Sequence, residues 1–457
     1  MGHQRKVNAM PEAESAQAKA ALSETMSRPW LASLPEGWTV QRIKHVARFA
    51  GGGTPSKAVD DYWGGHIPWV SPKDMKVFRI TETQDYITNA AVGSSACSLI
   101  PAGSALMVVR SGILQHTIPM AINDVPVCLN QDMKALIPED GMLSEYLAYL
   151  VQGLNDRFLD EWVKQGATVE SIEHESMANT PIPVPPTDHQ LAIATYLGAE
   201  TKRIDGLIEE KKRLQDSLIE LKVRRITEIL TGEVDATQPT GDIWLPKIPV
   251  GWELKRLKHL GQVRSGLAKG KKHESGVMTV ELPYMRVANV QDGYIDLSDV
   301  TMIEVAESEV ERYTLRMGDV LMNEGGDYDK LGRGAMWEGR VKQCLHQNHV
   351  FAVRLDDVKW APWVAAVTRT SYAKFYFMNN SKQSTNLASI NQTNVKEFPV
   401  VIPPVSQRDE LLRILTDELR RIDDLVRHVE QELEVLAEFR SSTITDAVLG
   451  RIDVRPA

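Results

Sequence analysis

The sequence predicts an α+β fold with two related globular domains, separated by two long helices that pair antiparallel as a coiled coil within the chain. Three observations support this fold class. A block of about 215 residues occurs twice, the first part of each copy is rich in short β-like segments, and the last part carries an apolar heptad pattern without proline. A unit that is written twice can fold with internal pseudo-two-fold symmetry.

The duplication is clearest at the start of each copy. Leu34–Gly52 and Ile248–Gly266 share seven of nineteen residues, including a Pro, a Gly and a Trp near the beginning. Later matches keep the same order, with an offset of 214 to 218 residues: Ile67-Pro68-Trp69 with Leu282-Pro283-Tyr284, Ile100–Met107 with Leu315–Met322, Cys128–Gln131 with Cys344–Gln347, Pro185-Pro186 with Pro403-Pro404, Arg203-Ile204-Asp205 with Arg421-Ile422-Asp423, and Ile226-Thr227 with Ile444-Thr445.

Seven segments follow from these patterns. The predicted boundaries are a polar leader at 1–33, a first domain at 34–186, a central helix at 187–232, a linker at 233–247, a second domain at 248–404, a C-terminal helix at 405–450 and a tail at 451–457. Each domain contains β-like runs bounded by Gly, Pro, Asn and Asp, such as Ala105–Arg110 and Val350–Leu355, with helical stretches such as Glu145–Trp162 between them. This alternation predicts a compact domain of about 150 residues.

The two helices are predicted from apolar residues at spacings of three and four, with Gly232 and Gly450 standing where each helix should end. Each helix would be roughly 65 Å long and needs a partner for its apolar face. The other helix of the chain is the nearest partner, and parallel pairing between two chains is the alternative. Lys211 interrupts the first stripe, where we favour a snorkelling side chain over a register-fixing one. The residues expected to pair the helices are Leu197, Ile204, Leu214, Leu218, Leu221, Leu415, Ile422, Val429 and Leu436.

Composition excludes several classes of protein. The chain has 457 residues, 43% hydrophobic and 25% charged, as in ordinary globular proteins. It contains no run of eighteen apolar residues, so we predict no membrane span, and the leader lacks the apolar segment of an export signal. Cys97, Cys128 and Cys344 lie far apart and are expected to be core thiols, which fits a reducing cytoplasm. The net charge of −9 argues against DNA binding unless basic groups are concentrated locally or supplied by partners.

The sequence contains no pattern that we associate with catalysis. Gly266–Lys272 has three residues before its second Gly and no Ser or Thr after Lys, so it is not a phosphate-binding loop. His346–His349 contains two histidines, but the equivalent stretch of the first copy has none, which favours a polar loop at a strand edge over a metal cluster. Gly-rich cofactor loops, HExxH, CxxC and the Asn-Pro-Pro-aromatic motif of amino-methyltransferases are absent. We therefore predict no catalytic residue and no metal site.

Basic residues are concentrated in the second domain. Lys255–Lys272 contains seven Lys or Arg, one His and no acid; residues 248–404 hold 20 basic and 18 acidic side chains, whereas residues 34–186 hold 11 and 17. On charge alone the second domain is the better phosphate binder, although a solvated surface is an equally good interpretation. Two repeated polar stretches, Lys164–Thr168 and Lys382–Asn386, carry side chains that can read base edges, but turn formation is the favoured interpretation.

Taken together, these blocks resemble the specificity subunit of a type I DNA restriction–modification system. The resemblance covers about 34–453 and departs from the pattern where the second copy has Leu267-Ala268-Lys269 in place of Thr-Pro-Ser, and Ser384-Thr385-Asn386 in place of Gly-Ala-Thr. It rests on Leu34-Pro35-x-Gly37-Trp38, Gly52-Gly53-Thr54-Pro55-Ser56, Tyr62-Trp63-Gly64-Gly65, Ile67–Met75, Gln165–Thr168 with Ile172 and Ile182–Pro186, and the terminal Arg-Ile-Asp helices.

The resemblance implies two target recognition domains, each reading one half of a bipartite, asymmetric sequence in double-stranded DNA. It implies that the helices, through the pairing residues named above, set the non-specific spacer and dock two modification subunits, which bind S-adenosylmethionine and methylate adenine. Restriction subunits would add cleavage that depends on ATP and Mg, so this chain would carry no enzyme activity and no cofactor. A stand-alone methyltransferase or nuclease, and a coiled-coil scaffold with two protein-binding domains, are the alternatives.

The candidate DNA contacts are cationic or polar residues in Gly-containing segments that a packed core could not bury. They are Lys269, Lys271, Lys272, Arg286, Asn289, Lys330 and Arg333 in the second domain and, matched by position in the repeat, Lys57, Lys73, Arg110 and His116 in the first.

Overall fold

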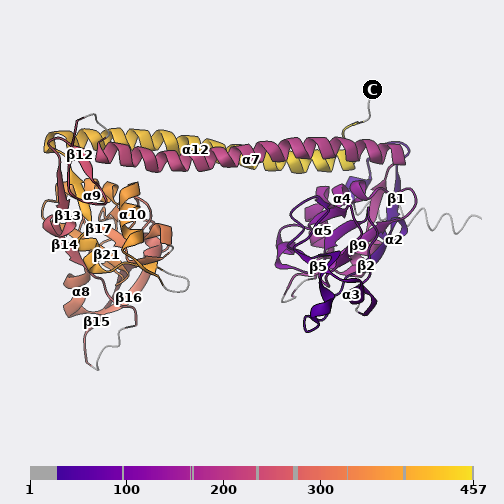
Figure 1. Cartoon of the computed structure of the whole chain (residues 1–457), viewed down its shortest axis with the longest axis horizontal. Helices are drawn as coiled ribbons and strands as arrows, with labels where there is room; N and C mark the ends of the chain where they lie inside the picture. The colour runs from indigo at the N-terminus through magenta and orange to yellow at the C-terminus, as the bar shows by residue number, and fades with distance from the viewer. Residues whose placement is uncertain are drawn as a thin grey trace, which may run out of the picture. The chain divides into compact units, whose positions relative to one another are not determined.

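The computed structural model describes residues 28–94, 97–164, 166, 169–232, 236–270, 276–326, 328–383 and 388–454. Contacts divide the chain into two units, one of residues 1–210 with 432–457 and the other of residues 211–431. Each unit contains one β-rich domain and a segment of each long helix (Figure 1). The second unit is continuous in sequence, whereas the first is completed only by the C-terminal end of the chain.

The first domain is built on a five-stranded sheet in which two of the inner strands are buried on both faces. Along β6, Ala105 and Met107 face the core that includes α4, while Leu106 and Val108 face a second cluster, as the two-residue period of a strand requires. The sheet order is β2 (Ala47–Gly51), β9 (Met133–Pro138), β6 (Ala105–Val108), β7 (Met120–Asn123) and β4 (Arg79–Ile80). The remaining strands are β5 (Asp85–Ile87), β3 (Trp63–Val70) and β8 (Cys128–Leu129) in one sheet, and β1 (Thr39–Arg42) with β10 (Pro181–Val184). The helical elements are η1 (Pro29–Leu31), α2 (Ile43–Val46), η2 (Asp60–Tyr62), α3 (Asn89–Ser94), η3 (Gly112–Gln115), α4 (Ser144–Gly153), α5 (Asn155–Trp162) and α6 (His174–Asn179).

The second domain repeats this framework with a four-stranded sheet. Its order is β14 (Gly261–Arg264), β21 (Val350–Leu355), β17 (Val320–Asn323) and β19 (Gly334–Met336). The other sheets are β16 (Thr301–Ala306), β15 (Thr279–Met285) and β20 (Leu345–His346); β13 (Glu253–Arg256) with β24 (Pro399–Ile402); β18 (Gly325–Gly326), β23 (Ala388–Ser389) and β22 (Lys382–Gln383); and β11 (Thr237–Pro239) with β12 (Lys247–Pro249). The helical elements are η4 (Leu257–His259), η5 (Val287–Asn289), α8 (Glu307–Tyr313), η6 (Tyr328–Lys330), η7 (Val358–Trp360), α9 (Ala361–Val367), α10 (Ser371–Asn379) and α11 (Gln392–Lys396).

The strand registers of the two domains agree. In the first domain β2 pairs with β9 and β9 with β6, and in the second domain β14 pairs with β21 and β21 with β17, all antiparallel. Equivalent pairs are Ala47 with Pro138 and Gly261 with Leu355, and also Ala105 with Leu136 and Val320 with Val353. These registers make it possible to compare single positions of the two domains.

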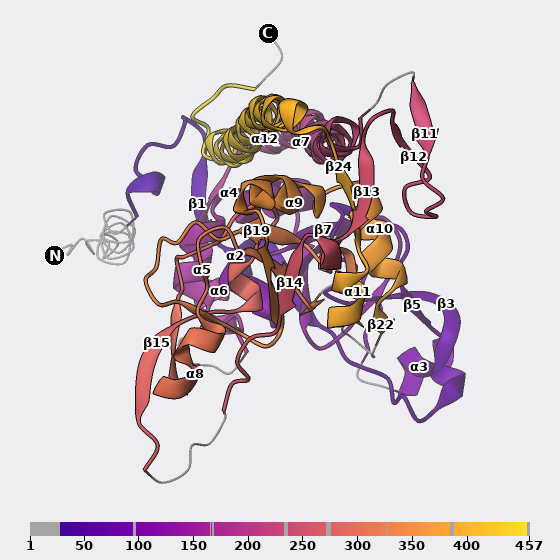
Figure 2. The same ribbon diagram turned by 90° about the vertical axis from the view of Figure 1, so that its left-hand side faces the viewer.

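The long helices α7 (Thr187–Thr231) and α12 (Val405–Val448) lie side by side in both views (Figure 1, Figure 2). In the second unit Gln215 bonds to Glu430 and Arg225 pairs with Glu418, so the residue numbers rise along one helix and fall along the other. The pairing is therefore antiparallel and lies within one chain.

The repeated Arg-Ile-Asp triplets contribute the same ion pair to each unit. In the first unit the carboxylate of Asp205 accepts from Arg440 at 2.7 Å, and in the second unit Asp423 pairs with Lys222. Arg440 and Lys222 are themselves equivalent in the repeat. The fold class predicted from the sequence is confirmed, with two domains and an intramolecular coiled coil.

The apolar contact between the two long helices is called the seam below. One of the nine residues predicted to pair the helices does not lie in it. Leu214 is 44% exposed, because the seven-residue phase that begins at Leu197 and Ile204 runs through Lys211 instead. Leu221 and Leu436 are half-buried. The six buried residues of the set are Leu197, Ile204, Leu218, Leu415, Ile422 and Val429.

Each long helix ends against the domain of the other repeat. The hydroxyl of Thr445 on α12 donates to the carbonyl of Gly153 at 2.7 Å, and the hydroxyl of Thr227 on α7 accepts from the backbone N–H of Ser371 at 2.9 Å. These threonines are equivalent in the repeat, as are the buried isoleucines that precede them, Ile226 and Ile444. The repeated Ile-Thr pair thus anchors a helix end in each domain.

The helix-ending glycines are held by the repeated Pro-x-Gly-Trp motif. Gly232 and Gly450 adopt φ of +72° and +65°, and a Cβ on either would lie 2.3 Å from Pro249 or 2.4 Å from Pro35. The tryptophans of the same motif donate to the first turn of a long helix: Trp38 to His189 at 3.3 Å and Trp252 to Gln407 at 3.0 Å.

Two predicted boundaries need correction. Trp30 and Leu31, placed in the leader, are buried in the first core because η1 packs them beside α5. The predicted linker contains β11 and part of β12, and its Trp244 contacts Tyr376 at 5.4 Å between ring centroids. Both segments therefore belong to folded units. In the part of the chain that the structure describes, no helix has the length and apolarity needed to cross a membrane.

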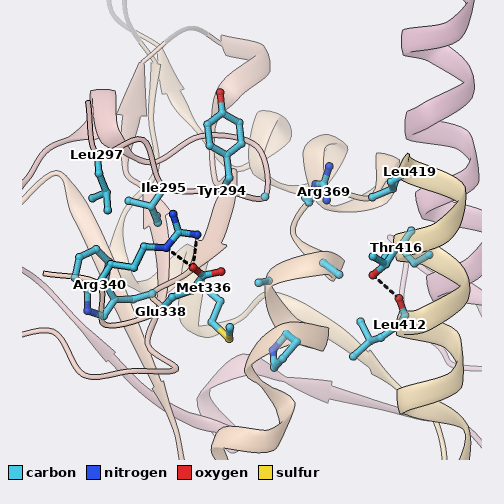
Figure 3. Close-up of a pocket in the computed structure, with 16 residues that line it drawn as sticks. Tyr294, Ile295, Leu297, Met336, Glu338, Arg340, Arg369, Leu412, Thr416 and Leu419 are labelled. Atoms are coloured by element: carbon cyan, nitrogen blue, oxygen red, sulfur yellow. Dashed lines mark hydrogen bonds and ion pairs between the residues drawn. The ribbon is translucent and has the colours of Figure 1, made fainter. Parts of the chain in front are cut away.

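We call the place where a domain packs against the long helices its domain–helix joint. The joints of the two units differ in one aromatic ring. In the first unit Tyr149 stacks on Phe78 at 4.6 Å between ring centroids, and the second unit has Ala366 at the position of Tyr149. A cavity of about 490 Å³ lies there, lined among others by Tyr294 and Thr416 (Figure 3). One joint is filled by an aromatic pair, and the other is left open.

We expect the seam to be essential for stability. Replacing the 4%-exposed Ile422 by Asp should lower the free energy of unfolding by about 3 kcal/mol or more, because an unpaired carboxylate would be buried. The matched control is Leu425→Asp on the same helix, which is 51% exposed and should cost less than about 0.5 kcal/mol. Urea unfolding of the full chain measures both changes, and equal losses would contradict the seam.

Candidate nucleic-acid interface

Each domain holds a glycine-containing loop tightly against a neighbouring strand end. A Cβ on Gly52 would lie 2.0 Å from the carbonyl of Asn130, and one on Gly266 would lie 2.1 Å from that of His346. In both domains the backbone carbonyl of the following loop residue accepts a hydrogen bond from an aromatic side chain. The indole N–H of Trp69 donates to Gly53 at 3.0 Å, and the hydroxyl of Tyr284 donates to Leu267 at 2.6 Å. The loops are therefore pinned alike, although their following residues differ.

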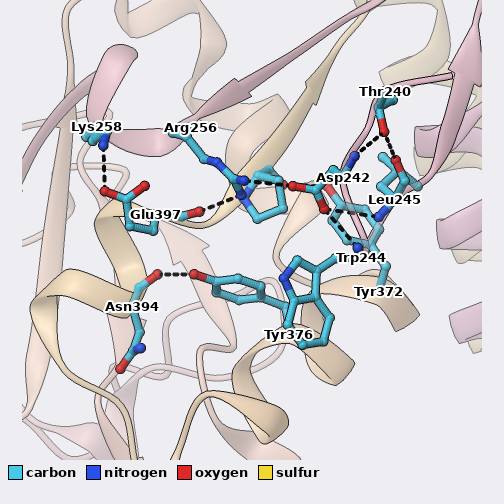
Figure 4. Close-up of polar contacts among 11 residues, drawn as sticks. Thr240, Asp242, Trp244, Leu245, Arg256, Lys258, Tyr372, Tyr376, Asn394 and Glu397 are labelled. Carbon is cyan, nitrogen blue, oxygen red and sulfur yellow. Dashed lines mark hydrogen bonds and ion pairs between the residues drawn. The ribbon is translucent and has the colours of Figure 1, made fainter.

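Three cations of the basic run Lys255–Lys272 are neutralised inside the second domain. Lys255 pairs with Glu253 at 2.6 Å, while Arg256 and Lys258 pair with acids distant in sequence (Figure 4). Those two pairs are Arg256 with Asp242 at 2.8 Å and Lys258 with Glu397 at 2.5 Å. The Lys258 ammonium, chiefly through its hydrogen bond, holds the pKa of Glu397 below its usual value. The start of the run therefore braces the β13–β24 edge, and a phosphate contact from these cations would require exchange of a partner.

The later part of the run remains the candidate surface. Lys269 is exposed on the loop that follows Gly266. Lys271 and Lys272 lie outside the described residues. Of the candidates further along, Lys330 is exposed at the end of η6, and Arg333 is half-buried just before β19.

Asn289 must be withdrawn as a DNA contact. Its side chain is 3% exposed, and its amide nitrogen donates at 2.9 Å to the carbonyls of Asp296 and Asp299 while its oxygen accepts from the backbone of Arg286. A buried amide with these partners closes its own loop and has no donor left for a base. Arg286 is ion-paired with Asp299 at 2.7 Å, so a DNA contact from it would require exchange of that partner.

The four first-domain candidates all lie at the surface. Lys57, Lys73 and His116 are exposed, and Arg110 pairs with Asp132 at 2.8 Å. The backbone beside Arg110 bridges to Ser171, near the polar stretch Lys164–Thr168. In that stretch and in Lys382–Asn386, residues 165, 167, 168 and 384–386 lie outside the described residues, so these contacts stay predictions.

The histidine-containing stretch runs from the end of β20 into a loop and has a structural role. His346 is 1% exposed, and its Nδ1 lies 2.7 Å from the carbonyl of Val350, while His349 pairs with Glu324 at 2.6 Å. Among the residues that the structure describes, no group of three His, Cys, Asp or Glu side chains could hold a metal ion.

Comparison with known proteins identifies the family. The profile described as Type I restriction modification DNA specificity domain matches residues 35–215. The type I restriction enzyme MjaIX specificity subunit of Methanocaldococcus jannaschii is 24% identical over 437 residues, which cover 93% of this chain and 95% of the relative. The chain is a type I restriction–modification specificity subunit. Over a shorter stretch of 174 residues, 37% of this chain and 43% of the relative, it is 40% identical to the EcoR124I/EcoR124II specificity subunit of Escherichia coli.

A solved structure extends the likeness of this specificity subunit to the whole fold. A chain from a study of complex assembly and conformational transition in the type I R-M system superposes with a TM-score of 0.68 at 15% identity. The match covers 92% of this chain and all of the other. At that identity the likeness concerns the fold alone, and it includes both domains and both long helices.

Sequence reasoning missed one group of charges in the specificity subunit. Arg312, Arg316 and Arg354 are scattered in the sequence, but the fold brings them beside Arg264 of the basic run. A comparison of the two repeats could have found this group, because the equivalent positions of the first domain that strand pairing defines are uncharged.

His346 should make stability depend on pH. Burial, followed by repulsion from Arg264, lowers the pKa of His346 to about 4 although its bond to Val350 opposes the shift. The unfolded chain therefore binds a proton near pH 6.5 that the folded chain binds only near pH 4. Stability contributed by neutral His346 is present above pH 6.5 and is lost as the pH falls toward 4, by roughly 3 kcal/mol in total.

The matched variant is His346→Asn, which keeps a donor for the Val350 carbonyl but does not titrate. Urea unfolding at several pH values between the two pKa values should show a steeper loss for the unchanged chain than for the variant. Parallel curves would mean that the pKa of His346 is the same in the folded and the unfolded chain.

Proposed function

We propose that this chain directs type I modification and restriction to a bipartite, asymmetric DNA sequence, with each domain reading one half. The long helices set the unread spacer between the halves and dock two modification subunits. The observation that carries this proposal is the division between what is repeated and what has diverged. Repeated residues build the domain–helix joints, whereas the loops that carry the candidate DNA contacts differ between the copies.

The repeated part suits a partner that is present twice. Two copies of one modification subunit need two equivalent surfaces, and the joints offer them. The residues involved at each joint are Pro35, Trp38, His189, Thr445 and Gly450 in the first unit, and Pro249, Trp252, Gln407, Thr227 and Gly232 in the second. This supports docking at the helices and their ends.

The diverged part suits two different half-sites. The glycine loop is pinned alike in both domains, yet it continues as Thr54-Pro55-Ser56 in one and as Ala268-Lys269 in the other. The first domain has 17 acidic and 11 basic side chains, so its phosphate contacts would be fewer and the modification subunits would supply part of the charge. Unequal domains on one framework are what an asymmetric target requires.

The chemistry is assigned to partners. The modification subunits would bind S-adenosylmethionine and methylate adenine, and restriction subunits would use ATP and Mg for cleavage. The buried His346 and the paired carboxylates of the described residues serve the fold, which favours a subunit that specifies over a stand-alone methyltransferase or nuclease. The coiled-coil scaffold is the second rival, and it predicts no DNA sequence preference.

A domain exchange tests the division of labour. The chain is expressed with its modification subunits, and the methylated sites of the host genome are sequenced. Replacing residues 248–404 by the second domain of another specificity subunit should change the bases of one half-site and leave the other half and the spacer as they were. A scaffold would direct no methylation, and a methyltransferase would methylate DNA without the partners.

We expect the helices to set the spacer. Inserting one heptad after Glu210 in α7 and one after Gln431 in α12 lengthens the coiled coil by roughly 10 Å, which equals about three base pairs of DNA. The spacer should grow by about that amount while both half-sites stay the same. A control insertion of four residues in α7 alone breaks the heptad phase and should abolish assembly; a changed half-site in the double insertion would contradict the proposal.

A further inference from the structure

Four arginines and one buried carboxylate come together in the second domain. Arg264 ends β14, Arg354 lies on the neighbouring strand β21, and Arg312 and Arg316 lie at and after the end of α8. Asp319, directly before β17, is 1% exposed. The group lies two residues before Gly266, so it adjoins the pinned loop that presents Lys269.

The carboxylate of Asp319 is fully committed to other partners. Its Oδ1 accepts from Nε of Arg354 at 2.8 Å, and its Oδ2 accepts from Nη2 of Arg354 at 2.6 Å and from the backbone N–H of Arg316 at 2.8 Å. Arg264 donates instead to the backbone carbonyl of Arg312. Arg354, Arg316 and Arg312 repel the Arg264 guanidinium, whereas Asp319 attracts it.

The group therefore carries an excess of positive charge. Burial first, and then repulsion from Arg354, lower the pKa of Arg264, as expected for a half-buried guanidinium among like charges. Glu311 lies 3.6 Å from Arg316, but its side chain is 91% exposed and neutralises little. Holding a partly desolvated cation in such surroundings costs free energy unless an anion joins it.

The fold does not require these charges. Strand pairing places Ala50 at the position of Arg264 and Ile137 at that of Arg354, and the residue before β6, Ser104, matches Asp319. The first domain thus builds the same framework with small or apolar residues. An apolar replacement of a buried ion pair is often neutral or stabilising, so the charged version has no structural advantage that explains it.

We propose that Arg264, Arg312 and Arg316 bind a phosphate group of the DNA backbone, with the Arg354–Asp319 pair as the positioning element. This rests on the proposed function and adds a contact that the second domain alone possesses. A phosphate supplies the missing negative charge, and guanidinium forks match its oxygens in two-point hydrogen bonds. The contact positions the domain on DNA and reads no base, since phosphates are alike in every sequence.

The test is the salt dependence of DNA binding by the full chain assembled with its modification subunits. A short duplex of random sequence is titrated at salt concentrations between about 50 and 200 mM, because counterion release is independent of sequence. Arg264→Gln and Arg316→Gln should each lower the slope of log affinity against log salt by about one unit. The Kd ratio of variant to unchanged chain should then be roughly three- to fourfold larger at the low than at the high salt concentration.

Two controls separate this role from charge and from folding. Arg340→Gln removes the same charge from the same domain at a 64%-exposed residue paired with Glu338, and should leave the slope unchanged. Arg264→Lys keeps a cation and should restore the slope. The triple change Arg264→Ala, Asp319→Ser and Arg354→Ile installs the residues of the first domain; it should keep the melting temperature and still lower the slope.

The outcomes test the phosphate site separately from the proposed function. If the unchanged chain binds the duplex with a steep salt dependence and the Arg264, Arg316 and triple variants match it, the phosphate site is wrong and the proposed function stands. If the unchanged chain shows no DNA binding at any salt concentration, both fail together.

Discussion

Each domain of this specificity subunit is closed by the end of a helix from the other repeat. The first core takes in Ile444 and Val448 of α12, and the second takes in Ile226 and Leu230 of α7. Burial of these side chains is what makes a helix far longer than a domain stable, since its own hydrogen bonds contribute little net free energy. The antiparallel direction, the paired seam and the glycine stops all serve to bring each helix end to that position.

The architecture could be predicted because it follows from periodicity, and periodicity is local. Repeats and heptads reveal the domains, the helices and Gly450 as a helix stop, whereas errors arose where the surroundings of a single side chain decide. Leu214 is apolar, yet the heptad phase set by its neighbours turns it outward. Asn289 follows the pattern of an exposed loop, but its amide closes that loop. The basic run gave no sign that Lys258 meets Glu397, which lies 139 residues away.

The two domains share one backbone framework but carry different side chains at equivalent positions, which explains why they can diverge without losing their fold. At one set of equivalent positions the first domain has Ala50 and Ile137, where the second has arginines. At another, Tyr149 fills a joint that Ala366 leaves open. Backbone pairing is the same at the first set of positions, because strand register depends on alternation and not on the chemistry of single side chains. Charge can therefore be added or removed on one half of the molecule independently of the other.

The division of the chain into a continuous and a split unit also sets the order in which it matures on the ribosome. Residues 211–431 emerge in one piece and contain every segment of their unit, whereas the first domain waits with an open core until residues 432–457 are made. The part synthesised first is thus the last to be completed. A premature stop within the final turns of α12 would damage the N-terminal domain, hundreds of residues upstream, and spare the domain beside it in sequence.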